Sequence, residues 1–196
     1  MKRFRKLLIW MSRIRHVHGF GIHSPSAYRF AREVINSRRR TKECKELGRS
    51  LKGVPHMVRR LGELYFRISL HVKCDIWLDW RGSGDVYKLY VELTGRQIRF
   101  VSSDECFEWS QFGKNEHLVV RATVDDHMET FYEEVINHAN EHSILILEPS
   151  SNRKAFCDLW QKILDDDRTG VTFDLYYCGI VFFDKYRPKQ NHIVNF

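Results

Sequence analysis

The sequence predicts an α/β protein with three layers, in which helices cover both faces of a mostly parallel sheet that ends in an antiparallel hairpin. Ile144–Leu147 is a continuous apolar run, typical of a strand buried on both faces. Ile76–Leu78 precedes a glycine-containing turn and then a helix with apolar residues at helical spacing. Val171–Tyr176 and Gly179–Phe183 are β-rich stretches with almost nothing between them, which predicts the terminal hairpin.

The composition indicates one folded domain. The chain has 196 residues, of which 43% are hydrophobic, and no apolar run reaches the roughly 18–20 residues that a membrane-spanning helix needs. The five cysteines are an odd number, are widely spaced and form no CxxC pair. This pattern argues against a disulfide framework and against a zinc site, so we expect reduced thiols, a cytoplasmic protein and no bound metal.

Positive charge is concentrated in the first third of the chain. Residues 1–70 contain 18 Lys and Arg against 4 acidic residues, and residues 71–196 contain 14 against 21. We expect 1–70 to be a basic helical segment packed on a core formed by 71–196. The alternative is a surface for a polyanion, either nucleic acid or an anionic membrane. His16, His18 and His23 have no acid or cysteine among them, so they predict no metal site.

The helices are predicted from their apolar faces and their first residues. Ser24 is an expected N-cap before Pro25, a polar segment then runs to Gly53, and Pro55 begins a second helix. Asp126, with Glu129 three residues later, predicts a capping box for a later helix. The predicted apolar faces are Phe4, Leu7, Leu8, Met11 and Ile14; Met57, Leu61, Leu64, Tyr65 and Ile68; and Phe156, Leu159, Trp160 and Ile163.

The candidate binding residues follow two predicted strands. Asp79 comes at the end of the first strand and is followed by the turn Arg81-Gly82-Ser83-Gly84. The next strand, 97–105, contains Asp104 close to its end, 25 residues after Asp79. A strand, a glycine turn, a helix and a second strand with an acid are the beginning of a nucleotide-binding α/β unit.

The whole order resembles the class I S-adenosylmethionine-dependent methyltransferases, and in particular a group of small bacterial proteins of that family. The segments that carry the closer resemblance are His18-Gly19-Phe20-Gly21-Ile22-His23-Ser24-Pro25 near the N-terminus, the Trp160 helix, and Gly179-Ile180-Val181-Phe182-Phe183. The resemblance implies a Rossmann-like methyltransferase fold. This chain is shorter by about one β-α unit between Asp104 and Ile144, where one convincing strand, at 118–122, is predicted in place of two.

The resemblance also implies a site for S-adenosylmethionine. Asp79, Arg81, Gly82, Ser83 and Gly84 would lie along the methionine part of the cofactor. Asp104, with Glu105 as the second choice, would bind the ribose hydroxyls. The family pattern has a glycine where this chain has Arg81, whose side chain could block the pocket or pair with the cofactor carboxylate. Glu148, at the end of a central strand, is the candidate on the substrate side.

Three functions follow from these observations. The first is methyl transfer to an unidentified acceptor, for which the sequence identifies no catalytic residue, because alignment of donor and acceptor supplies much of the rate. The second is a non-catalytic relative that serves as a binding or scaffolding protein. The third is polyanion binding through the basic first third, without a recognisable nucleic-acid-binding motif. Trp77, Trp80, Trp109 and Trp160 are expected to serve packing.

Overall fold

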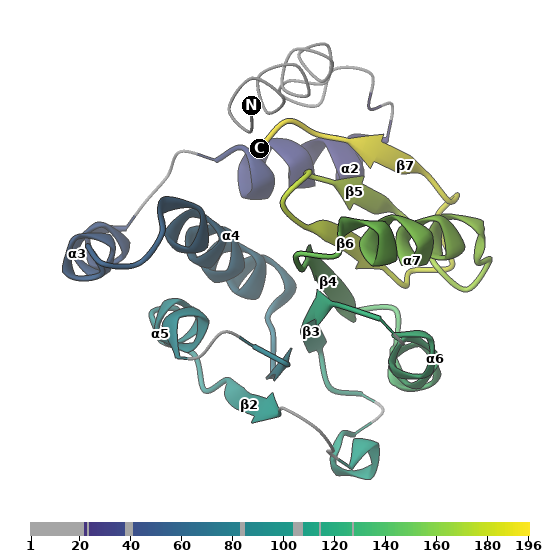
Figure 1. Cartoon of the computed structure of the whole chain (residues 1–196), viewed down its shortest axis with the longest axis horizontal. Coiled ribbons are helices and arrows are strands. Elements are labelled where there is room, and N and C mark those ends of the chain that lie inside the picture. Colours follow the sequence, from purple (N-terminus) through teal and green to yellow (C-terminus); the bar gives the residue numbers. More distant parts are fainter. Residues whose placement is uncertain are drawn as a thin grey trace.

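The described residues form one seven-stranded sheet with helices on both faces (Figure 1). The computed structural model describes residues 22, 24–37, 41–82, 85–103, 108–113, 115–126 and 128–196. The expected α/β class, with a mostly parallel sheet and antiparallel pairing near the C-terminus, is confirmed. The expectations for residues 1–21 and 23, which include the first amphipathic helix and His16, His18 and His23, lie outside the described residues.

The strand order in the sheet is β2-β1-β3-β4-β6-β5-β7. β6 is antiparallel to its neighbours β4 and β5, and every other neighbouring pair is parallel. The strands are β1 (Ile76–Trp80), β2 (Arg99–Ser103), β3 (Leu118–Val124), β4 (Ile144–Pro149), β5 (Thr172–Asp174), β6 (Gly179–Phe182) and β7 (Asn191–Ile193).

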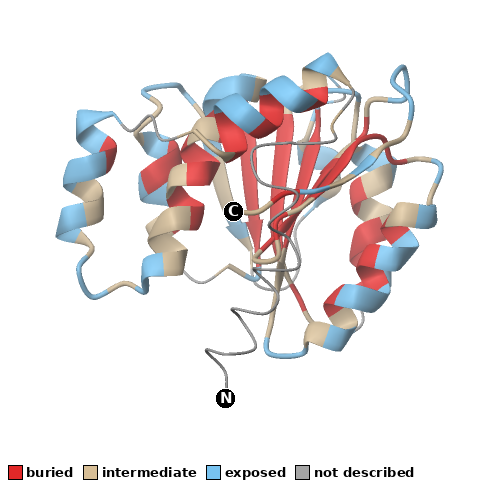
Figure 2. Ribbon diagram, turned by 90° about the horizontal axis from the view of Figure 1, so that it is seen from above, coloured by how far each residue is buried: buried red, intermediate tan, exposed pale blue. Residues whose placement is uncertain are grey.

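The central strands are buried on both faces, as the continuous apolar run at 144–147 predicts (Figure 2). One face is covered by α4 (His56–Val72) and α5 (Val86–Glu92), with α2 (Pro25–Phe30) and the π-helical turn η2 (Ala31–Ile35) beside them. The other face is covered by α6 (Glu129–His138) and α7 (Arg153–Asp165). Because side chains alternate along a strand, the central strands β1, β3, β4 and β6 supply both layers of the core.

A helix occupies part of the stretch that the sequence pattern predicts as a polar segment. α3 (Lys42–Ser50) begins where the Thr41 hydroxyl accepts a hydrogen bond from the Cys44 amide. Its narrow apolar face, Cys44 and Leu47, packs against Phe66 of α4 and Tyr90 of α5. The segment is polar, as predicted, and it is also helical: this helix covers other helices and not the sheet (Figure 1), so few apolar residues are enough.

The beginning of α6 also differs from the prediction. Its N-cap is Met128, without a side-chain capping bond, and the helix begins at Glu129. Asp126 instead accepts a hydrogen bond from the Asn152 side chain, just before α7. The expected capping box is therefore absent, because the carboxylate of Asp126 has a partner from another loop.

The C-terminal hairpin forms as predicted, and one further strand follows it. β5 and β6 pair through Thr172↔Val181 and Asp174↔Gly179. Gly179 is required at its position, since a Cβ there would lie 2.2 Å from the Trp160 ring. The expected polar tail forms the short strand β7, which pairs in parallel with β5.

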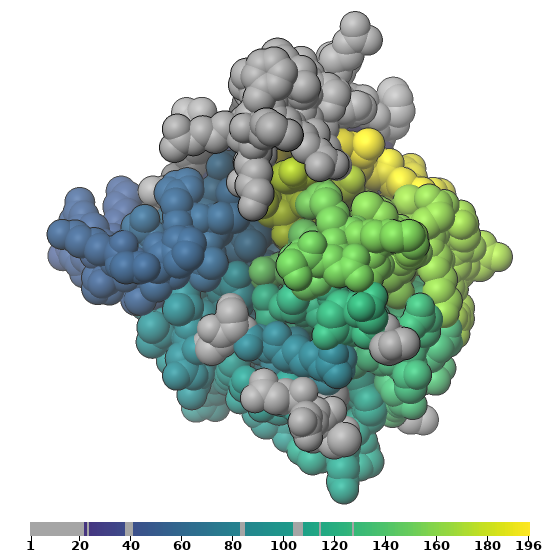
Figure 3. Space-filling view, viewed as in Figure 1, coloured from purple at the N-terminus to yellow at the C-terminus, as the bar shows by residue number. Residues whose placement is uncertain are grey.

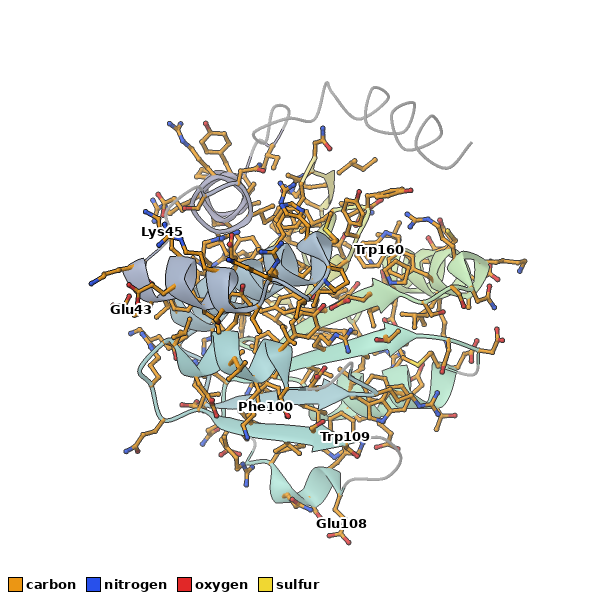
Figure 4. The ribbon with its side chains drawn as sticks, turned by 60° about the vertical axis from the view of Figure 1, so that its left-hand side comes forward. Glu43, Lys45, Phe100, Glu108, Trp109 and Trp160 are labelled. Atoms are coloured by element: carbon orange, nitrogen blue, oxygen red, sulfur yellow. The ribbon has the colours of Figure 1, made fainter. Side chains whose placement is uncertain are left out.

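The remaining fold-level predictions concern packing and cysteines. Trp77, Trp80 and Trp160 are buried, in agreement with a packing role. Trp109 lies in the short 3-10 helix η3 (Trp109–Gln111), which Figure 4 shows below the β2 side of the sheet. The described cysteines are free thiols, at Cys44, Cys74, Cys157 and Cys178. None of the described helices is long and apolar enough to cross a bilayer.

Candidate functional site at the carboxyl ends of the parallel strands

The sheet reverses its strand order beside β1. From β1 the chain proceeds to β2 on one side and then to β3 on the other side. In open α/β sheets, ligands bind outside the carboxyl ends of the strands at such a switch point. Asp79, Arg81 and Gly82 lie there, at the end of β1 and in the turn that follows it.

The turn after β1 has a backbone that restricts its residues. Arg81 has φ of 50°, in the left-handed region that glycine adopts most readily, and its amide donates to the Ser103 carbonyl at the end of β2. A Cβ on Gly82 would lie 2.0 Å from Oδ2 of Asp79. The turn therefore needs glycine at 82 for lack of space, and it has the glycine-like conformation at 81 although the residue is arginine.

The Arg81 side chain crosses from the β1 loop to the β3 loop. Its guanidinium forms an ion pair with Asp125, just after β3, and lies 4.3 Å from the centroid of the Trp80 ring. Both members of the ion pair are 43% exposed. Such a half-exposed pair contributes little to stability, about 0–1 kcal/mol, so a ligand could displace it at small cost.

A buried ion network lies directly under this turn, on the face covered by α4 and α5. Arg121, in the middle of β3, donates from Nε to Glu148 (2.9 Å) and from Nη1 to Asp79 (3.1 Å). The side chains of Arg121, Asp79 and Glu148 are 2%, 1% and 13% exposed. The register of β1, β3 and β4 sets this arrangement, since it aligns Asp79 with Arg121 and places Glu148 beyond Ile146, the partner of Arg121.

Two tyrosines from the covering helices complete the network. The hydroxyl of Tyr65, on α4, donates to Oε1 of Glu148, and that of Tyr87, on α5, donates to Oε2 over 3.2 Å. The Arg121 guanidinium also lies over the Tyr87 ring, 5.1 Å from its centroid. Both oxygens of Glu148 are therefore engaged by donors from three different elements.

Burial and the nearby carboxylate fix the protonation of these partners. Burial raises the pKa of Tyr65 well above its usual value, and the negative charge of Glu148 raises it further. The same two causes raise the pKa of Tyr87. Burial disfavours the charge of Arg121, but Glu148, Tyr65 and Asp79 together outweigh that effect, and the pKa of the guanidinium rises. The tyrosines therefore remain proton donors, and Arg121 remains charged.

The structure brings together some of the predicted residues and adds others. Asp79 and Glu148 are joined through Arg121, and Gly82 packs on Asp79. Ser83, Gly84 and Asp104 lie outside the described residues. Arg121 is not among the residues predicted from the sequence, although a lone arginine inside the apolar strand 118–124 was a signal, because a buried cation needs an acid partner.

The described residues of this site form no metal centre, and comparison with known proteins assigns it no role. Within the described part of the chain, no three His, Cys, Asp or Glu side chains are grouped so that they could hold a metal ion. The chain matches no protein-family model, and no curated protein matches it. The function must therefore be argued from the geometry at the carboxyl ends of β1, β3 and β4.

Proposed function

We propose that this protein binds S-adenosylmethionine at the carboxyl ends of β1 and β3 and transfers its methyl group to an unidentified acceptor. The observation that carries the proposal is the Trp80-Arg81-Gly82 turn, with positive φ at 81 and no space for a Cβ at 82, at the switch point of the sheet. A glycine-like backbone at 81 is the form that would let a cofactor approach the turn closely. The mostly parallel sheet with an antiparallel β6 supports the finer assignment, a Rossmann-like methyltransferase fold.

The proposed residues have distinct roles toward the cofactor. The turn from Asp79 to Gly84 would hold the methionine part, and Asp104 would accept hydrogen bonds from the ribose hydroxyls. The cofactor would supply an electrophilic methyl group. Its carbon would bond to the acceptor's electron pair while the sulfonium sulfur kept the old pair and left as S-adenosylhomocysteine, and any proton lost by the acceptor would pass to solvent.

A second function, a non-catalytic binding protein, is favoured by one specific observation. Both oxygens of Glu148 accept hydrogen bonds, from Tyr65, Arg121 and Tyr87, and the carboxylate is 13% exposed. In this arrangement Glu148 is not placed to remove a proton from an acceptor. If the protein is an enzyme with Glu148 on its substrate side, as the sequence predicts, the acceptor must therefore be one that needs no general base.

Calorimetry with S-adenosylmethionine and S-adenosylhomocysteine tests the proposal. Asp104→Ala should weaken binding about ten- to a hundredfold, because losing charge-assisted hydrogen bonds costs roughly 1.5–3 kcal/mol. A wild-type protein that shows no heat with either compound at millimolar concentration refutes the cofactor assignment. Mass spectrometry of protein purified without added ligand is an independent check for retained cofactor.

Two further variants separate the possible roles of Arg81. Arg81→Gly removes both the side chain and its ion pair, whereas Asp125→Asn frees the arginine without shortening it. If Arg81 binds the cofactor carboxylate, Arg81→Gly weakens binding and Asp125→Asn strengthens it. If Arg81 obstructs the pocket, Arg81→Gly strengthens binding, which favours the non-catalytic protein. Methyl transfer itself is then followed with labelled cofactor and candidate acceptors.

A further inference from the structure

A pocket lined by cationic side chains lies between α3 and the first turns of α4, outside the candidate methyl-transfer site. Its charged and titratable lining residues are Cys44, Lys45, Arg49, His56, Arg59, Arg60 and Glu63. Lys45 and Arg49 are four residues apart and share one face of α3. Figure 3 shows α3, in blue, at the edge of the molecule, and Figure 4 labels Lys45 on it.

The cations of this pocket have no internal partners of opposite charge among the described residues. Lys45, Arg49, Arg59 and Arg60 form no ion pair with any residue that the structure describes. Lys42, on the same helix but outside the pocket, does pair with Glu46. These four cations share the pocket with one acid, Glu63, so the lining keeps an excess of positive charge that an anion would neutralise.

Arg59 provides a second observation that points to a ligand. Its Nη1 donates to the Gly48 carbonyl (2.9 Å), which fixes the guanidinium between the two helices. Its Nε is buried and has no hydrogen-bond partner. A buried donor without a partner costs free energy, so an acceptor that reached this nitrogen would bind favourably.

The beginning of α4 adds to the positive potential. The N-cap Pro55 has no side chain that could accept from the first amides of the helix. These amides, with the positive end of the helix dipole, favour an anion in the same place as the lining cations. Because α4 ends just before β1, its first turn lies toward the carboxyl ends of the strands, on the side of the candidate site.

We propose that this pocket is a binding site for phosphate groups. Arginine forks match the oxygens of a phosphate in two parallel hydrogen bonds, and neighbouring lysine supplies further charge. Residues 41–60 contain six Lys and Arg against two acids, whereas residues 71–196 carry a net negative charge. A phosphate ester or the backbone of a single-stranded RNA would therefore be attracted to this side of the molecule. The proposal is independent of the methyl-transfer function.

The test uses the full chain with two probes, inorganic phosphate by calorimetry and a short fluorescent single-stranded RNA by anisotropy over a series of salt concentrations. The pocket variant is Lys45→Gln with Arg49→Gln, two exposed residues of α3. The control is Lys42→Gln with Lys52→Gln, which removes the same charge nearby but from residues that do not line the pocket. Melting temperatures verify that both variants fold.

The pocket variant should bind its probe about tenfold more weakly or worse, while the control changes by a few-fold at most. For RNA, the slope of log affinity against log salt should become shallower by about 0.7 for each phosphate that the variant no longer neutralises. Tight binding of phosphate alone identifies a small phosphate ester as the ligand, and RNA binding with the salt effect identifies nucleic acid. Absence of binding by both probes, or equal weakening in the pocket variant and the control, overturns the proposal.

Discussion

Replacing Arg121 tests whether the buried ion network holds the carboxyl ends of β1, β3 and β4 together. Arg121→Met keeps similar volume but removes the charge, which leaves Asp79 and Glu148 as acids without their shared cation. Breaking a buried pair by removing one partner costs roughly 3–5 kcal/mol. For a domain of this size each kcal/mol lowers the melting temperature by about 2–4 °C, so the expected loss at pH 7 is roughly 6–20 °C.

Three controls assign the effect to the network. Lys154→Met, which breaks the exposed pair with Asp158, should leave the melting temperature nearly unchanged. Arg121→Lys keeps the charge but cannot reach both acids with a fork, so it should lie between wild type and Arg121→Met. Adding Asp79→Asn and Glu148→Gln to Arg121→Met should restore part of the stability. A melting temperature for Arg121→Met within about 2 °C of wild type would refute the reasoning.

Three other predictions concern stability. Gly179→Ala should lower the free energy of unfolding by about 1–3 kcal/mol, because its Cβ would lie 2.2 Å from the Trp160 ring. Gly53→Ala, with no atom within 4 Å of its Cβ, is the matched control for chemical denaturation, and an equal loss in both would contradict the packing argument. Burial raises the pKa of Tyr87, so the unfolded chain releases this proton at a lower pH than the folded protein does. The contribution of Tyr87 to the free energy of unfolding is therefore present below about pH 10 and is lost as pH rises further. Tyr87→Phe should therefore make stability above pH 10 less pH-dependent, by up to about 1.4 kcal/mol per pH unit, and an unchanged pH dependence in this variant would contradict the assignment to Tyr87. Hydrogen bonds from Arg168 lower the pKa of Asp166 to about 2. The contribution of Asp166 to the free energy of unfolding is therefore present above the pKa that it has in the unfolded chain, and it is lost as pH falls toward 2. An acid titration of Asp166→Asn should lack that component, and a curve parallel to wild type would show that Asp166 is not its source.

The local parts of the fold could be predicted from the sequence because short-range patterns encode them. The run Ile144–Leu147 predicts a buried strand, and Ser24-Pro25 predicts a helix start that the structure confirms, with the Ser24 hydroxyl accepting from the Ala27 amide. α3 was not predicted because its apolar face packs only on other helices and is therefore narrow. The capping role predicted for Asp126 was wrong because its carboxylate accepts a hydrogen bond from the side chain of Asn152, which lies in another loop.

The sequence by itself determined the fold class, the antiparallel hairpin and the candidate residues Asp79, Gly82 and Glu148. It could not determine which charges meet, because Arg121 is 42 residues from Asp79 and 27 from Glu148. Only the register of β1, β3 and β4 places them within hydrogen-bond distance, and only the burial under α4 and α5 makes their pairing obligatory. The same reason applies to Arg81, whose backbone conformation and pairing with Asp125 depend on two loops that meet only after the sheet has formed.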